Sequence, residues 1–290
     1  MANKTTQTRS PITSEEIFSG IRASMDFFND VEQVAGFALP ADDHILFSRI
    51  WTTLRGISND KSLPVTVCKN CSKIEMHISE LQSCLASLFY HIDNVKHMEK
   101  RLNTLINQYK DKTPAANGGS FNPTLTNRFT FEYHAFAFAS VRSVNHVFPV
   151  LGYICFRNYC PSSKSFNEKS KGNTSTLVAA VNDILKEHSI LKKLFKKENQ
   201  KSIRDLIAHD KFLYAGSLHI EKEKAKLIGI LPMDISHYDE RSEPNIYLLS
   251  QIMTNQADHI KQFVMQILAT IESNTDILRT QRFSALTQNS

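Results

Sequence analysis

The stretch from about Ser72 to Tyr109 constrains the fold more than any other part of the chain. Its apolar residues recur at steps of three and four, the spacing that places them on one face of an α-helix. They are Leu81, Leu85, Leu88, Ile92, Val95, Met98, Leu102, Leu105 and Ile106. A helix of this length with a continuous apolar face has to pack against something. We therefore expect it to be a dimerisation or regulatory element, or else part of the core.

The rest of the sequence also favours helices. Nine glycines and nine prolines in 290 residues are few, which disfavours a turn-rich sandwich or barrel. Residues 217–231 differ, because two β-compatible ends flank a charged middle, and they predict a small β-hairpin. The predicted fold class is therefore all-α, a helical bundle with a hairpin insertion. Further helices are predicted over residues 14–37, 42–54, 127–149, 176–197, 201–213 and 246–272.

A segment rich in Gly, Pro and Asn, residues 112–127, divides the chain. It predicts two regions, an N-terminal helical region over residues 1–115 and a second helical domain over residues 125–275. A further polar stretch, residues 158–174, predicts a mobile loop. The N-terminal region is expected to sense a trigger, to restrain the second domain or to mediate dimerisation.

Composition and patterning favour a cytoplasmic protein. The first residues have no apolar run, so a secretion signal is not expected. The most apolar stretch, residues 129–156, is interrupted by charged residues and histidines and predicts a buried helix, so no membrane partner is expected. Five cysteines at irregular spacing do not form a disulfide framework. A reducing cytoplasm fits this cysteine usage.

The formal net charge of +5 falls entirely within residues 117–290, since residues 1–116 carry equal numbers of basic and acidic residues. An excess of this size is compatible with a polyanionic partner, or with an ordinary solvated surface. A lysine-rich segment covers residues 186–201. Four of its lysines, which would track RNA phosphates or simply face solvent, are Lys193, Lys196, Lys197 and Lys201.

The motif with the strongest chemical meaning is Arg204-Asp-Leu-Ile-Ala-His209. Transesterification of RNA needs a base for the ribose 2′-OH, an acid for the leaving 5′-oxygen and a cation for the phosphate. A histidine that titrates near neutral pH suits the proton transfers. The planar fork of an arginine suits the phosphate. Such chemistry needs no metal and no cofactor.

Helix geometry makes this motif incomplete within one chain. On an ideal α-helix, a five-residue step leaves Arg204 and His209 about 140° apart. Asp205 and His209, four residues apart, share a face, so that Asp205 could orient the imidazole. Pairing two such helices across a two-fold axis would bring duplicated arginine and histidine side chains into one cleft. We therefore expect a homodimer.

Over residues 125–275 the chain resembles the HEPN family of helical bundles, which carry an Arg-x(4–6)-His motif. A second stretch that carries the resemblance is Phe131-Glu-Tyr-His-Ala-Phe-Ala-Phe-Ala-Ser-Val-Arg-Ser-Val144, about 70 residues upstream. It is similar to a HEPN helix with an acidic residue, an aromatic-small run and an Arg-Ser pair. The matching positions here are Glu132, Phe136, Phe138, Arg142 and Ser143.

The resemblance implies an endoribonuclease that leaves a 2′,3′-cyclic phosphate and a 5′-hydroxyl. Arg204 and His209 would be catalytic and Asp205 supporting. Glu132 would hold Arg204, or would be only a surface or capping residue. The family commonly acts as toxins or phage-defence effectors, so the expected partners are RNA, a second copy of the chain, and an antitoxin or regulatory protein. Some HEPN domains cleave nothing, which leaves a non-catalytic nucleotide- or protein-binding module as the alternative.

A third hypothesis is a helical scaffold with a zinc-stabilised N-terminal region. Cys68-Lys-Asn-Cys71 resembles half of a zinc site. His77 and Cys84 follow but do not form a second close pair, so two ordinary thiols are the simpler interpretation. Rival enzyme signatures are absent from the sequence, including a P-loop, a dinucleotide-binding glycine motif and His-Glu-x-x-His.

Overall fold

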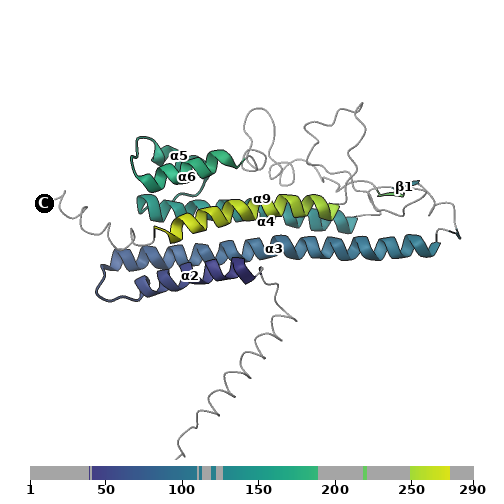
Figure 1. The fold of residues 1–290 in the computed structure, drawn as a ribbon, viewed down its shortest axis with the longest axis horizontal. Helices are drawn as coiled ribbons and strands as arrows, with labels where there is room; N and C mark the ends of the chain where they lie inside the picture. Colours follow the sequence, from purple (N-terminus) through teal and green to yellow (C-terminus); the bar gives the residue numbers. More distant parts are fainter. Residues whose placement is uncertain are drawn as a thin grey trace, which may run out of the picture. The chain divides into compact units, whose positions relative to one another are not determined.

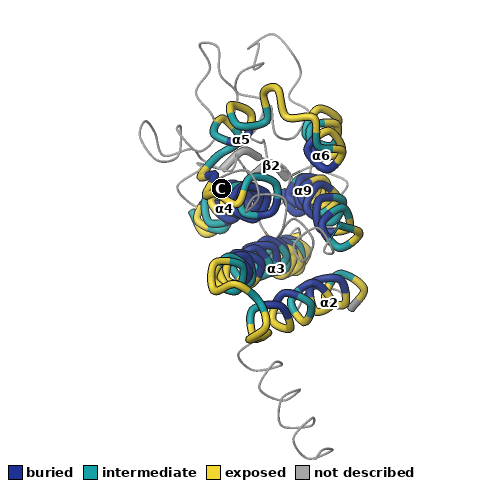
Figure 2. Tube along the Cα trace, turned by 90° about the vertical axis from the view of Figure 1, so that its left-hand side faces the viewer, coloured by how far each residue is buried: buried dark blue, intermediate teal, exposed yellow. Residues whose placement is uncertain are grey.

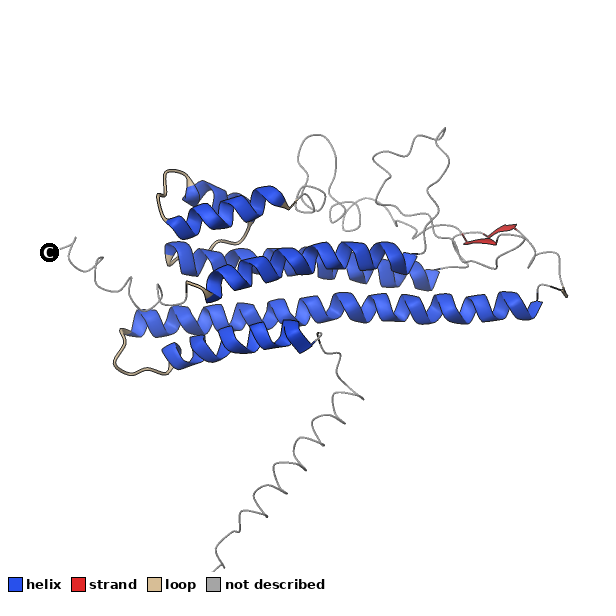
Figure 3. Cartoon of the chain, in the orientation of Figure 1, coloured by secondary structure: helices blue, strands red, loops and turns tan. Residues whose placement is uncertain are grey.

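The computed structural model describes residues 39, 41–109, 111–112, 127–188 and 249–274, together with the backbone of residues 119–121 and 218–220. Six helices account for nearly all of this part of the chain (Figure 3). They are α2 (Ala41–Ser58), α3 (Val65–Tyr109), α4 (Asn127–Phe156), α5 (Ser163–Ser170), α6 (Thr176–Glu187) and α9 (Leu249–Glu272). The predicted all-α class is confirmed for the described residues. A specific HEPN topology stays a prediction.

Helix α3 organises the packing. It contacts α2, α4 and α9, and α4 and α9 also contact each other. In Figures 1 and 2, α2 and α3 lie on one side of α4 and α9, while α5 and α6 lie on the other. Buried residues of these helices face one another and form one hydrophobic cluster (Figure 2). Residues on both sides of the predicted break at 112–127 thus share one core. The functional division into residues 1–115 and 125–275 stays a prediction.

The apolar stripe predicted for α3 is largely buried. Ile78, Leu81, Leu85, Leu88, Ile92 and Val95 are at most 3% exposed. Leu105 is an exception at 49% exposure, near the C-terminal end of the helix. Of the roles considered for this helix, packing in the core is the one that these contacts fulfil.

A buried carboxylate from α3 orders the start of α9. The Oε1 atom of Glu99 accepts a hydrogen bond of 3.0 Å from the backbone N–H of Ser250, and its Oε2 atom accepts one from the Ser250 hydroxyl. The first N–H groups of a helix have no partner within the helix, and they favour a negative charge. Glu99 is only 6% exposed, so its carboxylate serves as an interior cap for α9.

Helix α4 continues through Pro149 to Phe156, so the predicted end near Pro149 is wrong, whereas the predicted buried helix over residues 129–156 is confirmed. The residues on both sides of Pro149 are buried in the core, and this packing offsets the lost backbone hydrogen bond. Gly152 allows the chain to fold back closely after the helix. A Cβ atom at this position would lie 2.5 Å from the carbonyl oxygen of Asn158 and 2.7 Å from the backbone nitrogen of Cys160.

Two predictions between residues 158 and 197 are corrected. The predicted loop over residues 158–174 contains helix α5, because Ser162 caps its first turn and the fully buried Phe166 anchors it. The Phe166 ring lies 5.2 Å from that of Phe156, between ring centroids. Helix α6 ends at Glu187 and not at Lys197, since the backbone of His188 is extended.

The predicted hairpin over residues 217–231 lies only partly within the described residues. Strand β2 (Leu218–Ile220) pairs antiparallel with β1 (Gly119–Phe121), and Ser120 lies opposite His219. The second half of the hairpin, and the predicted helices over residues 14–37 and 201–213, lie outside the described residues. No helix in the described part of the chain is both long enough and apolar enough to cross a membrane.

Candidate functional site

Most of the predicted catalytic and RNA-binding residues lie outside the described residues. Arg204, Asp205 and His209 are in this group, as are the four lysines of the basic segment, Lys193, Lys196, Lys197 and Lys201. Their assignments stay predictions. Glu132 is the one residue of the predicted site within the described part of the chain.

Glu132 lies in the second turn of α4 and is bound by two side chains of α3. Its Oε2 atom accepts a hydrogen bond of 2.6 Å from Nδ1 of His91, and its Oε1 atom accepts one of 3.2 Å from Nδ2 of Asn94. The side chains of His91 and Glu132 are 15% and 27% exposed. Glu132 is therefore more than a surface or capping residue, because it connects α4 to α3.

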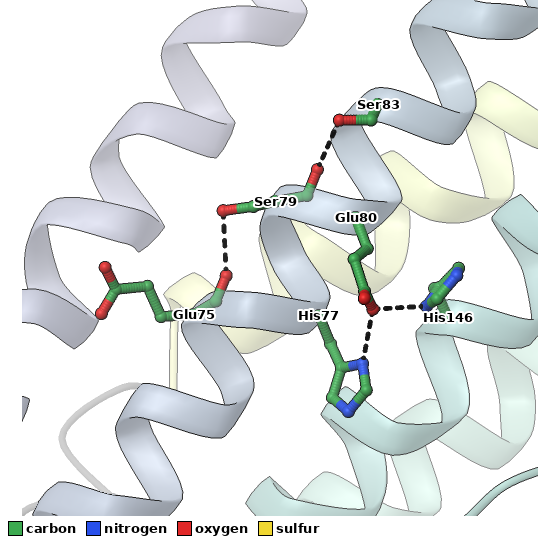
Figure 4. Close-up of polar contacts among 6 residues, drawn as sticks. All are labelled: Glu75, His77, Ser79, Glu80, Ser83 and His146. Carbon is green, nitrogen blue, oxygen red and sulfur yellow. Dashed lines mark hydrogen bonds and ion pairs between the residues drawn. The ribbon is translucent and has the colours of Figure 1, made fainter.

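A second group of polar side chains lies on the same pair of helices. It consists of His77 and Glu80 on α3 and His146 on α4, and we call it the His–Glu–His cluster (Figure 4). The Oε2 atom of Glu80 lies 3.0 Å from Nδ1 of His77 and 3.0 Å from Nδ1 of His146. Both imidazole rings thus point at the same carboxylate oxygen.

The members of the cluster differ in burial. The side chain of His77 is 11% exposed and that of His146 is 20% exposed, while that of Glu80 is 42% exposed. Burial lowers the pKa of His146, although the nearby Glu80 carboxylate acts in the opposite direction. His77 and Arg142 add to the lowering because their positive charges repel a further proton. The imidazole of His146 is therefore biased towards its neutral form, the form that binds a metal ion.

Two tyrosine rings stack near the imidazole of His77. The ring centroids of Tyr153 and Tyr159 lie 6.3 and 6.2 Å from that of His77, both in stacked orientations. The ammonium group of Lys73 lies 5.3 Å from the centroid of the Tyr153 ring. This packing restricts the orientation of the buried imidazole.

A groove of about 550 Å³ opens next to the cluster, between α3 and α4. One wall consists of small and polar residues of α3, including Ser79, Glu80 and Ser83, and the other includes Phe138 and Arg142 of α4. Glu80 belongs both to the groove and to the cluster, so the groove leads to the carboxylate of the cluster.

Among the described residues, the His–Glu–His cluster is the one group of three or more potential metal ligands whose ligand atoms lie close together, all within 4.8 Å of one another. Cys68 and Cys71, the pair suggested by the sequence, are not part of such a group. The Cys68 thiol instead lies 3.7 Å from the carbonyl oxygen of Ile57, and Cys71 is buried. A sequence signal for the cluster existed in His77-x-x-Glu80, which places both side chains on one helical face. Nothing local connected it to His146.

Comparisons of this chain with protein-family models, with characterised proteins and with solved structures found no match. The assignment of function therefore depends on the residues of the chain itself.

Proposed function

We propose that the chain is a metal-independent endoribonuclease of the HEPN type. The observation that carries the proposal is the hexapeptide Arg204-Asp-Leu-Ile-Ala-His209. His209 would act as general base, general acid or both, and Arg204 would stabilise the negative charge that develops on the phosphate. Asp205 would orient the imidazole of His209. The products would be a 2′,3′-cyclic phosphate and a 5′-hydroxyl.

The described helices support this proposal in two ways. The segment that resembles the upstream HEPN helix lies within α4, and most of its residues are buried or partly buried in the helical core. Glu132 is partly exposed, and a carboxylate has about four acceptor positions. Its hydrogen bonds to His91 and Asn94 therefore leave acceptor capacity for an arginine. In this proposal Glu132 would accept a hydrogen bond from Arg204 and hold its guanidinium group in place.

We further propose that the active species is a homodimer. The angle of about 140° between Arg204 and His209 on an ideal helix separates the two groups within one chain, and a second copy would supply the missing group. The basic segment that contains Lys193 and Lys197 would guide the RNA backbone. An enzyme of this kind would act in the cytoplasm as a toxin or phage-defence effector, held in check by an antitoxin or regulatory protein.

The test is RNA cleavage by the purified chain in the presence of EDTA, followed by analysis of the RNA ends. Wild-type protein should produce cyclic-phosphate and 5′-hydroxyl ends. His209→Ala removes both proton transfers and should lower the cleavage rate by at least about 100-fold. His97→Ala is the matched control, because His97 is an exposed histidine whose side chain is 70% accessible, and it should cleave as wild type does.

Cleavage that survives His209→Ala would overturn the catalytic assignment, and cleavage that EDTA abolishes would overturn metal independence. Mixing inactive Arg204→Ala and His209→Ala chains tests the dimer. If each chain supplies the group that the other lacks, the mixture should recover part of the activity.

A non-catalytic nucleotide-binding module is the second candidate. The groove between α3 and α4 favours it, since Arg142 would pair with a phosphate and Phe138, which is 42% exposed, would contact a base. Saturable nucleotide binding that Arg142→Gln weakens, without any RNA cleavage by the wild-type protein, would support this candidate over the nuclease.

A further inference from the structure

We propose that His77, Glu80 and His146 form a binding site for a divalent transition-metal ion of the zinc class. Two imidazole nitrogens and one carboxylate oxygen, from two helices, converge at this point (Figure 4). The site goes beyond the proposed nuclease activity, which requires no metal.

The distances suit a small metal ion. Nδ1 of His77 and Nδ1 of His146 each lie 3.0 Å from Oε2 of Glu80. Zinc binds histidine nitrogen and carboxylate oxygen at about 2.0–2.2 Å, so that neighbouring ligand atoms of a tetrahedral site lie about 3.3 Å apart. Both nitrogen–oxygen distances are within a few tenths of an ångström of this spacing, and all three potential ligand atoms lie within 4.8 Å of one another.

The ligand types also suit zinc better than the common alternatives. Two histidines with one carboxylate form a set that binds zinc and similar transition metals, whereas magnesium and calcium prefer oxygen ligands. No redox step is needed. The proton that each Nδ1 donates to Glu80 would leave that nitrogen, for Nε2 or for bulk water, and the Nδ1 lone pair would bind the ion.

The convergence itself distinguishes this cluster from an ordinary buried hydrogen-bond pair. At Glu132, each carboxylate oxygen accepts from its own donor, His91 or Asn94. At Glu80, two donors from different helices point at one oxygen. Three potential ligand atoms from two helices therefore lie close together here, as binding of one ion requires.

The surroundings allow a site with three protein ligands. Tyr153 and Tyr159 hold the ring of His77 in place. Arg142, on α4, opposes a cation, but the charge of Glu80 offsets this effect. The remaining coordination position is accessible from the groove that Glu80 and Arg142 both line. A water molecule or a small anion would fill it, and Arg142 favours the anion. A bound ion would connect α3 to α4 and stabilise their contact.

Isothermal titration of the EDTA-treated, dialysed full-length chain with zinc chloride tests the proposal. Wild-type protein should bind about one equivalent at this site, and saturating zinc should raise the melting temperature by about 5 °C. Glu80→Gln and His146→Gln remove one ligand on each helix, and each should weaken binding at least tenfold. Absorption of bound cobalt(II) provides a second measurement, since its visible bands report the ligand geometry.

Two matched controls come from α3. The carboxylate of Glu75 points away from the cluster (Figure 4), and His97 is an exposed histidine, so Glu75→Gln and His97→Gln should bind zinc as wild type does. Far-UV circular dichroism checks that each variant keeps its helices. The proposal is overturned if wild-type protein shows no saturable binding, or if Glu80→Gln and His146→Gln, folded, bind as tightly as the controls. Because RNA cleavage is measured in EDTA, failure of either proposal leaves the other intact.

Discussion

Two histidine–carboxylate groups connect α3 to α4, and they are built differently. In the first, the single Oε2 atom of Glu80 lies 3.0 Å from Nδ1 of both His77 and His146. In the second, Glu132 accepts from His91 with one oxygen and from Asn94 with the other. The side chain of Glu80 is also more exposed, at 42% against 27% for Glu132. The same residue types thus form an accessible set of potential ligands in one place and, in the other, a contact in which each carboxylate oxygen has its own donor.

The direction in which these side chains point therefore carries more information than their chemical type. A carboxylate with a separate donor for each oxygen gains little from an added ion. A carboxylate that shares one oxygen between two imidazoles brings three potential ligand atoms close together. Measurements of stability can separate these two situations. A structural contact contributes to the free energy of unfolding in metal-free protein, whereas a set of metal ligands contributes mainly when the metal is bound.

Glu99 provides the extreme case of a structural carboxylate, and its removal should have the largest effect on stability. Glu99→Ala leaves the first turn of α9 without its buried cap and should lower the free energy of unfolding by about 3 kcal/mol. Urea denaturation followed by circular dichroism measures this change. Glu75→Ala, on the same helix, should cost less than about 0.5 kcal/mol. Equal losses in the two variants would show that the bond between Glu99 and Ser250 does not order α9.

Glu132→Ala and Glu80→Ala test the comparison directly in metal-free protein. Glu132→Ala leaves His91 and Asn94 without their acceptor and should cost about 2 kcal/mol. Glu80→Ala should cost less than about 1 kcal/mol, since Glu80 is partly screened by solvent. Zinc at a concentration that saturates the wild-type site should stabilise wild type and Glu132→Ala equally and should stabilise Glu80→Ala less. An equally large cost for Glu80→Ala without zinc would identify both groups as structural contacts.

The cysteine thiols should respond least to added zinc. Their alkylation rates test whether Cys68 and Cys71 are the metal ligands instead of the His–Glu–His cluster. Burial raises the pKa of Cys71 to about 11 and that of Cys155 to about 12. Since the thiolate is the reactive form, alkylation of both by iodoacetamide should be slow at pH 8 and should accelerate about tenfold per pH unit up to pH 10. One equivalent of zinc should leave the alkylation rates of Cys68 and Cys71 unchanged. Protection of this pair by zinc would move the metal site to the cysteines.

Helical periodicity predicted the main helices because it is a local property. The apolar stripe of α3 and its burial were both predictable. Helices α2, α4 and α9 were also predictable, and most of their predicted ends lie within a few residues of the observed ones. Local signals were less reliable where one tertiary contact decides the structure. The polar residues 163–170 predict a loop, yet the burial of Phe166 beside Phe156 makes them a helix.

In the candidate site, single residues were predictable from the sequence, but their partners on other helices were not. Glu132 was identified from the sequence as a supporting residue, but its partners His91 and Asn94 were not. His77 was noted only beside the cysteines, and neither Glu80 nor His146 was connected to it. The catalytic assignments of Arg204, Asp205 and His209 still depend on the sequence motif alone.

By itself, the sequence of this protein determined the helical class, the buried face of its longest helix and a motif suited to RNA cleavage. These features depend on residues a few positions apart, where helix geometry relates them directly. Only the tertiary structure decided that His146 meets His77 and Glu80, and that Glu99 caps α9. These contacts join residues of different helices, and their formation depends on how those helices pack against one another. The position of a side chain across such an interface is set by the packing of the whole core and by no local pattern.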